Sequence, residues 1–371
     1  MAMSDASPSA ALEQALATVI DPELRRPMLE LGMLRDLRVD DSTAFMRVVL
    51  TTPACPLKDE IRGAIEAAVI GTVAGVATVE ISWDSNVTST RGLPGRQEIE
   101  GVRNVLAVSA GKGGVGKTTV SVNMAIALSL TGARVGLLDA DVYGPNVPIM
   151  MGITAQPEPG ESQRIRPLSA YGIKVMSFGT ILKPGQPVIW RGPMLAKGLR
   201  EFLYEVEWGE LDYLVVDLPP GTGDVQLSLA QSVPMTGAVI VTTPQDVSLA
   251  DVSRGIEMFR QVKVPVLGIV ENMSGFVCSH CGETTDIFGS GGGRGLAETY
   301  DIPFLGSIPL DPRIRLGGGD GQPLMAAAPD SAVGGVFRDV AAHIAGRVSQ
   351  ENFASTAAPV MPSGPRIPLR P

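Results

Sequence analysis

From residue 102 onward the chain repeats one hydrophobic pattern, in which short apolar runs alternate with longer stretches that suit helices. The runs span residues 105–108, 135–138, 213–216, 238–241, 266–270 and 304–306. Because they are apolar throughout and do not alternate with polar residues, they predict strands that are buried on both faces. The pattern therefore predicts an α/β fold, with a mostly parallel sheet flanked by helices.

The first 84 residues show a different pattern, which predicts a small α+β domain. A helix is expected to begin at Ser7-Pro8, since proline suits the first helical turn. The residues after it predict a hairpin with strands over 35–39 and 44–50, then a helix over about 57–71 and a strand over 77–83. This order suits a compact unit that is independent of the rest of the chain.

Two further segments are rich in residues that break regular structure. Residues 85–101 are polar and contain Pro94-Gly95, which predicts a linker. Residues 350–371 hold many prolines and small residues without apolar periodicity, which predicts a disordered tail. The second domain is therefore expected to span residues 102–349.

The composition argues against two classes of partner. The net charge is −9 and no block of basic residues occurs, which is unlike a nucleic-acid-binding protein, and only 5% of residues are aromatic, so few rings could stack on bases. The N-terminus lacks the basic and apolar segments of a signal peptide, and no window approaches the apolar length of a membrane span. We expect a cytoplasmic protein that binds neither nucleic acid nor membrane.

The main candidate for chemistry is a glycine-rich stretch between the apolar run 105–108 and a helical stretch that ends near Gly132. Glycines let consecutive backbone N–H groups point at phosphate oxygens, and the start of a helix attracts negative charge. Lys117 is expected to reach the terminal phosphates, and the Thr118 hydroxyl to bind Mg²⁺. The predicted phosphate-binding loop consists of Gly111, Lys112, Gly113, Gly114, Val115, Gly116, Lys117, Thr118 and Thr119.

Polar residues directly after apolar runs are further candidates, because ligands bind at the carboxyl ends of the strands in open parallel sheets. These residues are Asp139, Asp141, Asp217, Asn272 and, farther along, Asp311. A carboxylate can accept a hydrogen bond from attacking water or from a metal-bound water. An amide can pair with an adenine edge through its donor and its acceptor. We therefore predict that these residues complete a nucleotide site.

The loop string K-G-G-x-G-K-T-T resembles the deviant phosphate loops of the MinD, ArsA and nitrogenase iron-protein class. The resemblance implies that Lys112 reaches across a homodimer to the partner's phosphates. It also implies that Asp141 positions the attacking water and that Asp139 lies near Mg²⁺. In relatives, the segments around Asn272 and Asp311 contact the purine, which favours ATP.

The string D-L-P-P-G-T-G-D over 217–224 resembles the second switch of the Mrp/ApbC family of iron-sulfur carrier ATPases. In this resemblance Asp217 is the Walker B carboxylate, which holds Mg²⁺ through water. The family's members load an iron-sulfur cluster and hand it to apo-proteins, so cluster scaffold proteins and apo iron-sulfur proteins are the implied partners. A MinD-like positioning ATPase and a zinc or nickel chaperone stay open as alternatives.

Cys278 and Cys281 form a Cys-x-x-Cys pair. In a reducing compartment such a pair is typical of a metal or redox site. Two sulfurs cannot fill a four-coordinate site, but a two-fold dimer would supply four. The Mrp/ApbC resemblance implies a labile [4Fe-4S] cluster between the protomers, although members often have proline where this chain has Ser279. An interfacial zinc site and a redox dithiol remain alternatives.

The first domain resembles the small domain associated with iron-sulfur assembly factors. The resemblance rests on Asp21-Pro22-Glu23 and on the string T-T-P-A-C-P over 51–56. Cys55 is expected just before a helix, where the dipole would lower the pKa of its thiol and favour an accessory thiolate. A small buried hydrophobic residue is the alternative role.

Overall fold

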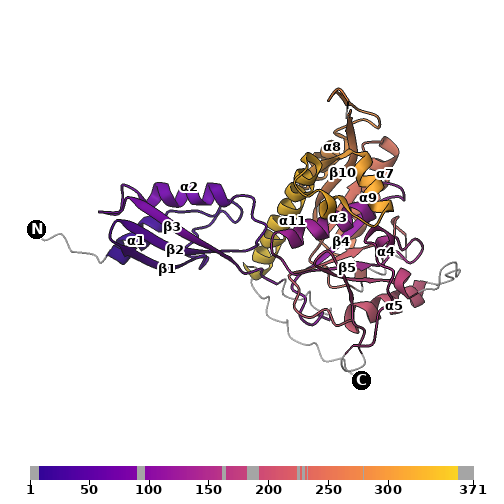
Figure 1. Ribbon diagram of the computed structural model, residues 1–371, viewed down its shortest axis with the longest axis horizontal. Coiled ribbons are helices and arrows are strands. Elements are labelled where there is room, and N and C mark those ends of the chain that lie inside the picture. The colour runs from indigo at the N-terminus through magenta and orange to yellow at the C-terminus, as the bar shows by residue number, and fades with distance from the viewer. Residues whose placement is uncertain are drawn as a thin grey trace, which may run out of the picture.

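The protein is described by a computed structural model over residues 8–89, 97–160, 164–181, 192–223, 226, 227, 230, 231, 233–278 and 280–357. Figure 1 shows a small N-terminal domain beside a larger domain. This arrangement confirms an α/β fold preceded by a small α+β unit.

The small domain is a three-stranded sheet packed against two helices. Its elements are α1 (Pro8–Leu16), β1 (Leu34–Asp40), β2 (Thr43–Leu50), α2 (Lys58–Val69) and β3 (Thr78–Ser85). Strand β2 pairs antiparallel with β1 and parallel with β3. Every second residue of β2 is buried, as expected for a strand with one face on a core. The hairpin, the second helix and the last strand were all predicted.

The larger domain is built on a nine-stranded sheet in the order β11-β10-β9-β4-β8-β5-β7-β6, with β12 paired to β10. The strands are β4 (Val105–Ala110), β5 (Val135–Asp139), β6 (Leu168–Ala170), β7 (Ile173–Ser177), β8 (Tyr213–Asp217), β9 (Gly237–Thr242), β10 (Val266–Val277), β11 (Thr284–Thr285) and β12 (Phe304–Leu310). All pairings are parallel except those of β6 and β11. The mostly parallel sheet is thus confirmed.

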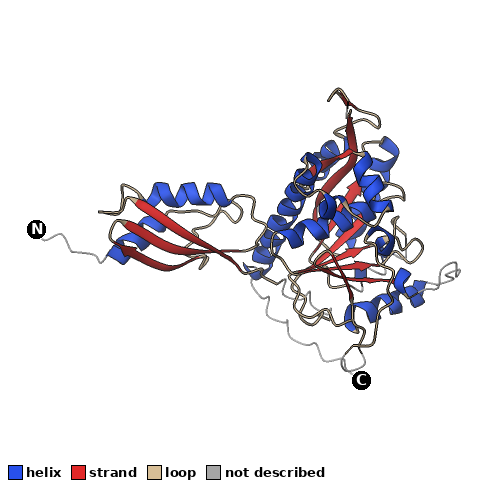
Figure 2. Ribbon diagram, in the orientation of Figure 1, coloured by secondary structure: helices blue, strands red, loops and turns tan. Residues whose placement is uncertain are grey.

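Helices cover both faces of this sheet (Figure 2). The helices are α3 (Lys117–Leu130), α4 (Val147–Met150), η2 (Phe178–Thr180), α5 (Gly192–Tyr204), α7 (Asp246–Gln261), α8 (Gly292–Tyr300), α9 (Pro312–Gly319), α10 (Leu324–Ala327) and α11 (Ala332–Ala357). Alternate residues of β4 face opposite cores: Leu106 packs with α3 and α11, whereas Ala107 packs with α5 and α7. Burial on both sides explains why the central strands are apolar throughout.

The predicted tail begins too early. Helix α11 continues to Ala357, and Asn352 is only 2% exposed. Its side-chain Nδ2 donates hydrogen bonds to Thr88 O and Asn104 Oδ1, at 2.8 and 2.9 Å. Because polar contacts bind this part of α11, hydropathy gave no signal for it. Residues 358–371 lie outside the described part.

The predicted linker is partly bound to the larger domain. Ser85 belongs to β3, and the side chain of Val87 is buried. The Thr88 carbonyl accepts hydrogen bonds from Asn104 and Asn352. Residues 90–96 of this segment lie outside the described residues.

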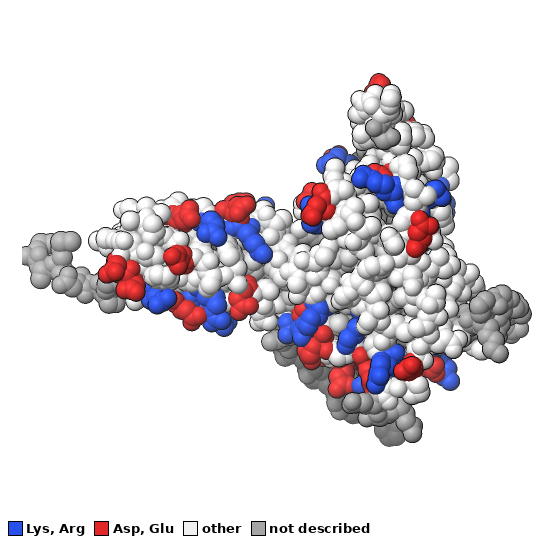
Figure 3. All heavy atoms as spheres, viewed as in Figure 1, with Lys and Arg blue, Asp and Glu red and all other residues white. Residues whose placement is uncertain are grey.

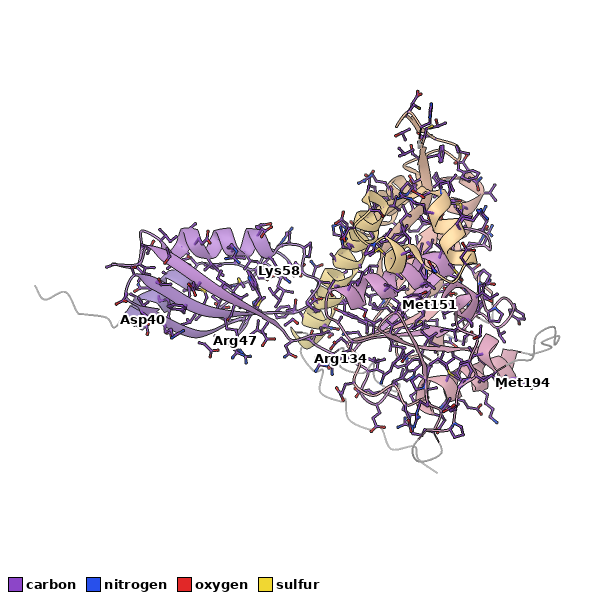
Figure 4. The ribbon with its side chains drawn as sticks, in the orientation of Figure 1. Asp40, Arg47, Lys58, Arg134, Met151 and Met194 are labelled. Atoms are coloured by element: carbon purple, nitrogen blue, oxygen red, sulfur yellow. The ribbon has the colours of Figure 1, made fainter. Side chains whose placement is uncertain are left out.

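The two domains meet at β8 and α11. The Tyr213 hydroxyl donates to Thr52 Oγ1 at 3.1 Å, and both side chains are buried. Gln350 Nε2 donates to Glu23 O at 3.1 Å, and the Arg26 guanidinium lies 5.1 Å from the centre of the Phe353 ring. Figure 4 shows Lys58, at the start of α2, on the side of the small domain that faces the larger one.

The described surface carries charges of both signs. On the face drawn in Figure 3, acidic and basic side chains are interspersed and form no broad basic patch among the described residues. No helix in the described ranges is long and apolar enough to span a membrane.

Candidate nucleotide site and cysteine pair

The glycine-rich loop lies between the end of β4 and the first residue of α3, as predicted. Gly114 and Gly116 both have φ of +81°, in the left-handed region that favours glycine. A β-carbon on Gly111 would lie 2.6 Å from the backbone of Asp251 in α7, so a larger residue would not fit there. These glycines give the loop its curvature at the N-terminus of α3, where backbone N–H groups can bind an anion.

Lys117, Thr118 and Asp217 form one cluster under this loop. Lys117 Nζ lies 2.8 Å from Asp217 Oδ2, and the Thr118 hydroxyl donates to the same oxygen at 2.7 Å. Asp217 is fully buried at the carboxyl end of β8. The structure therefore brings the predicted lysine and hydroxyl, which are adjacent in the sequence, together with the predicted carboxylate about a hundred residues later.

Ser121 is a member of this cluster that sequence reasoning missed. Its hydroxyl donates to Asp217 Oδ1 at 2.6 Å. Ser121 lies four residues after Lys117 on α3, so both side chains are on one face of the helix. That helical spacing was the available signal.

Asp139 and Asp141 approach the cluster from the end of β5. Asp141 Oδ2 lies 3.8 Å from Lys117 Nζ, and burial raises the pKa of Asp141 while Lys117 opposes that rise. Asp139 is fully buried and accepts a hydrogen bond from Ser177 Oγ at 2.8 Å. Burial, together with the charge of Asp217, raises the pKa of Asp139 to about 8. Of these two carboxylates, Asp141 is the one that forms an ion pair with Lys117.

A cavity of about 410 Å³ opens above the loop. It is lined by most of the loop residues, including Lys112 and Lys117, and by Asp141. Ile149 and Met150 come from α4, and Ile314 and Arg315 from α9. Sequence reasoning missed these last residues, because neither helix carries a motif that marks it as part of the site.

Asn272 and Asp311 do not line this cavity in the described structure. Asn272 lies beneath the loop, where its Nδ2 donates to Val115 O at 2.8 Å. Asp311 is the N-cap of α9 and pairs with Arg313 at 2.6 Å, and this hydrogen bonding lowers the pKa of Asp311. Contact of either residue with a purine stays a prediction.

Cys278 directly follows β10, which ends at Val277. Figure 1 shows the chain beyond the β10 label projecting from the larger domain. We call residues 274–291 the cysteine hairpin. The Cys278 backbone N–H donates to Glu283 O and the Gly282 N–H donates to Cys278 O, at 2.9 and 2.8 Å, which closes a tight turn. Strand β11 pairs with Phe276 and Val277 and holds the base of this turn.

Hydrogen bonds converge on the Cys278 sulfur. The donors are the backbone N–H of Cys281, the backbone N–H of His280 and the Cys281 thiol, and together they lower the pKa of Cys278. Cys281 is exposed and Cys278 is partly exposed. In the described part of the chain no three His, Cys, Asp or Glu side chains form a metal site. A metal bound by this pair therefore needs further ligands from elsewhere.

Cys55 differs from the prediction. It precedes α2, but burial raises the pKa of its thiol to about 11, and the hydrogen bond from the Leu57 backbone only partly opposes this effect. Asp21 and Glu23 lie close enough for their charges to raise it further. Cys55 packs against the core of the small domain. The expected thiolate is thus wrong, because desolvation outweighs the helix dipole.

This contrast predicts unequal thiol reactivity. At pH 8 we expect iodoacetamide to modify Cys278 at least about a hundredfold faster than Cys55. The Cys55 pKa of about 11 is about two units above that of an ordinary thiol, which lowers its thiolate fraction about a hundredfold, whereas the pKa of Cys278 is lowered. Peptide mass spectrometry over time measures both rates in one sample. The two rates should converge in denaturant, and similar rates in the native protein would contradict the assigned environments.

A sequence profile described as NUBPL iron-transfer P-loop NTPase matches residues 101–345, more than half of the chain. The chain belongs to this family. A second profile, described as iron-sulfur cluster assembly protein, matches residues 9–83. The two profiles cover the two domains, and both resemblances drawn from the motifs are confirmed.

Two relatives of this NTPase family match about nine-tenths of the chain, and a solved structure matches 60% of it. An iron-sulfur cluster carrier protein from Synechocystis sp. is 50% identical over 340 residues, which cover 90% of this chain and 96% of the relative. The Escherichia coli K12 iron-sulfur cluster carrier protein is 40% identical, with 90% of each chain covered. A nucleotide-binding protein from Archaeoglobus fulgidus, solved with ADP, is 41% identical with a TM-score of 0.55, over 60% of this chain and 88% of the other.

Proposed function

We propose that this protein is an ATPase that carries an iron-sulfur cluster on Cys278 and Cys281 and transfers it to apo-proteins. One observation carries the proposal: a Cys-x-x-Cys pair follows the strand that contacts the phosphate loop, with Cys281 exposed, Cys278 partly exposed and the pKa of the Cys278 thiol lowered. The carrier names of relatives that match 90% of the chain support the same cargo.

The nucleotide half of the proposal assigns roles to the loop cluster. Lys117 exchanges its contact with Asp217 for the terminal phosphates of ATP, since both partners offer anionic oxygens. The hydroxyl of Thr118 and the carboxylate of Asp217 are the oxygen donors that Mg²⁺ prefers, and Asp139 lies beside them. Bound Mg²⁺ would neutralise phosphate charge. Asp141 orients the attacking water as a hydrogen-bond acceptor.

The cargo half of the proposal requires two chains. A [4Fe-4S] cluster takes four thiolates, and each chain offers Cys278 and Cys281 at its hairpin. A two-fold dimer presents both pairs to one cluster. The lowered pKa of Cys278 favours the thiolate that binds iron.

Features around the cavity support a second copy. Lys112 lines the cavity, from which it can reach phosphates of the partner protomer. Ile149, which lines the cavity, is 61% exposed, and Tyr143 and Leu316, which follow the lining residues Asp141 and Arg315 in the sequence, are 60% and 47% exposed. Exposed apolar side chains gathered at one place are typical of an interaction surface. We infer a homodimer with the nucleotides near its interface, acting in the cytoplasm between cluster scaffold proteins and apo-proteins.

Anaerobic reconstitution with iron and sulfide tests this function. We expect a brown dimer with about four iron and four sulfide per two chains. No zinc should remain bound after the reconstitution with iron and sulfide. Absorbance, elemental analysis and light scattering measure these quantities. Zinc that stays bound while iron does not enter would contradict the carrier function and favour a metal chaperone.

A further inference from the structure

Strand β10 connects the phosphate loop with the cysteine pair. Asn272 donates to Val115 O in the loop, and a β-carbon on Gly116 would clash with Asn272 Nδ2. Cys278 follows six residues later in the same strand and turn. The phosphate loop is therefore in direct contact with the strand that leads to the cysteine hairpin.

Glu271 joins both ends of this hairpin to the sheet. Its side chain is fully buried, and Oε1 accepts hydrogen bonds from Ser274 Oγ at 2.5 Å and Gly291 N at 2.9 Å. Oε2 accepts from Gly293 N at 2.6 Å. Ser274 is the first residue of the hairpin and Gly291 its last, so one carboxylate closes the base of the loop that contains both cysteines.

The surroundings suit a carboxylate at this position. Gly291 is the N-cap of α8, so the Glu271 carboxylate lies at the N-terminus of that helix, where negative charge is favoured. Gly293 comes so close that an added β-carbon would lie 3.1 Å from Glu271 Cβ and Oε2. The contact is therefore specific in both charge and size.

The backbone leaves the extended conformation of a strand directly after Glu271 and Asn272. Met273 has φ of +57°, which is rare for a residue with a side chain, and Gly275 has φ of +74°. The pairing register between β10 and β12 shifts between Asn272 and Phe276. Earlier register shifts occur at Val266–Gly268 and Ile269–Val270, but only the one after Asn272 coincides with a non-glycine residue of positive φ. This irregular point lies between Glu271 and Cys278 in the chain.

We propose that Glu271 is a positioning residue that couples nucleotide binding at the phosphate loop to the cysteine pair. Asn272 contacts the loop and moves with it when ATP binds. Glu271, its neighbour in β10, holds both ends of the hairpin. ATP binding therefore changes the exposure of Cys278 and Cys281. This inference rests on the proposed function, because it describes how the ATP site would control the cargo site.

The test measures thiol reactivity in the full chain without iron. We expect a non-hydrolysable ATP analogue to change the iodoacetamide rate of Cys278 and Cys281 by about fivefold or more, the lower range of coupling between sites. Cys55 serves as the internal reference. In Glu271→Gln the amide N–H₂ group faces a backbone N–H donor, so the hairpin loses part of its anchor. The ratio of the iodoacetamide rates with and without the ATP analogue should therefore fall toward one.

Matched variants separate coupling from a simple loss of structure. Ser290→Ala removes an exposed hydrogen bond to Asp286 inside the hairpin and should keep the wild-type ratio. Ser274→Ala removes one of the three bonds to Glu271 and should give an intermediate ratio, even if Glu271→Gln unfolds. Binding of a fluorescent ATP analogue is measured in each variant, so that ratios are compared at equal occupancy.

Two results would overturn the inference. One is a wild-type thiol rate that does not respond to bound nucleotide. The other is a Glu271→Gln protein whose rates rise equally with and without nucleotide, as a purely structural role would produce. Failure of the proposed function is seen separately, as a protein whose thiols respond to nucleotide but which takes up no cluster during reconstitution.

Discussion

Lys117→Ala is expected to lower ATP hydrolysis by about a thousandfold, because it removes a preorganised positive charge from the phosphates. The lysine is buried, its Nζ lies 2.8 Å from Asp217 and 3.8 Å from Asp141, and it lines the cavity above the loop. No other lysine or arginine among the described residues contacts Asp217. Phosphate release assays at saturating ATP measure the effect.

The control for this variant is Lys197→Ala, which removes an exposed lysine of α5 that pairs with Glu201. It should hydrolyse ATP at the wild-type rate. Since Lys117→Ala also leaves Asp217 without its cation, thermal unfolding must show that the variant is folded; Thr118 and Ser121 still donate to Asp217. A folded Lys117→Ala protein with more than about a tenth of wild-type activity would refute the role given to this lysine.

The second large effect concerns the cargo. Cys278→Ser combined with Cys281→Ser should abolish cluster uptake, because no three Cys, His, Asp or Glu side chains in the described structure come together as an alternative metal site. Each single variant should also lose the cluster, since two remaining thiols per dimer leave half of its coordination sites unfilled. Iron content and the absorbance of the reconstituted protein measure the outcome.

Cys55→Ser is the matched control for the cysteine variants. Cys55 packs in the small domain, and its thiol carries a raised pKa, so it should contribute nothing to the cluster. We expect this variant to take up iron as the wild type does. Retention of the cluster by the double variant, or its loss in Cys55→Ser, would contradict the assignment of the cargo site.

Much of the nucleotide site could be predicted from the sequence. The loop and Asp217 each follow an apolar run, and parallel strands bring their carboxyl ends to one edge of the sheet. Ser177 escaped prediction because Lys174 interrupts the apolar pattern of β7. A lysine argues against a buried strand at this position. In the structure Lys174 Nζ donates a hydrogen bond to the carbonyl of Trp208, and this bond accommodates the lysine within the sheet.

The sequence misled where distant segments set the environment. Local reasoning placed Cys55 before a helix and expected a thiolate, yet burial raises its pKa. It predicted a disordered tail from residue 350, yet helix α11 continues to Ala357 and Asn352 is held by Thr88 and Asn104. Helix dipoles and hydropathy are local, whereas burial depends on residues far along the chain.

The most direct test of the account is anaerobic cluster transfer from the reconstituted protein to the apo form of a [4Fe-4S] enzyme whose activity returns with its cluster. We predict that the wild type restores activity and that ATP with Mg²⁺ changes the rate. Reconstituted Lys117→Ala should transfer at a rate that ATP does not alter. Equal rates for both proteins with ATP present, or activation by free iron and sulfide as fast as by the protein, would contradict ATP-controlled cluster transfer.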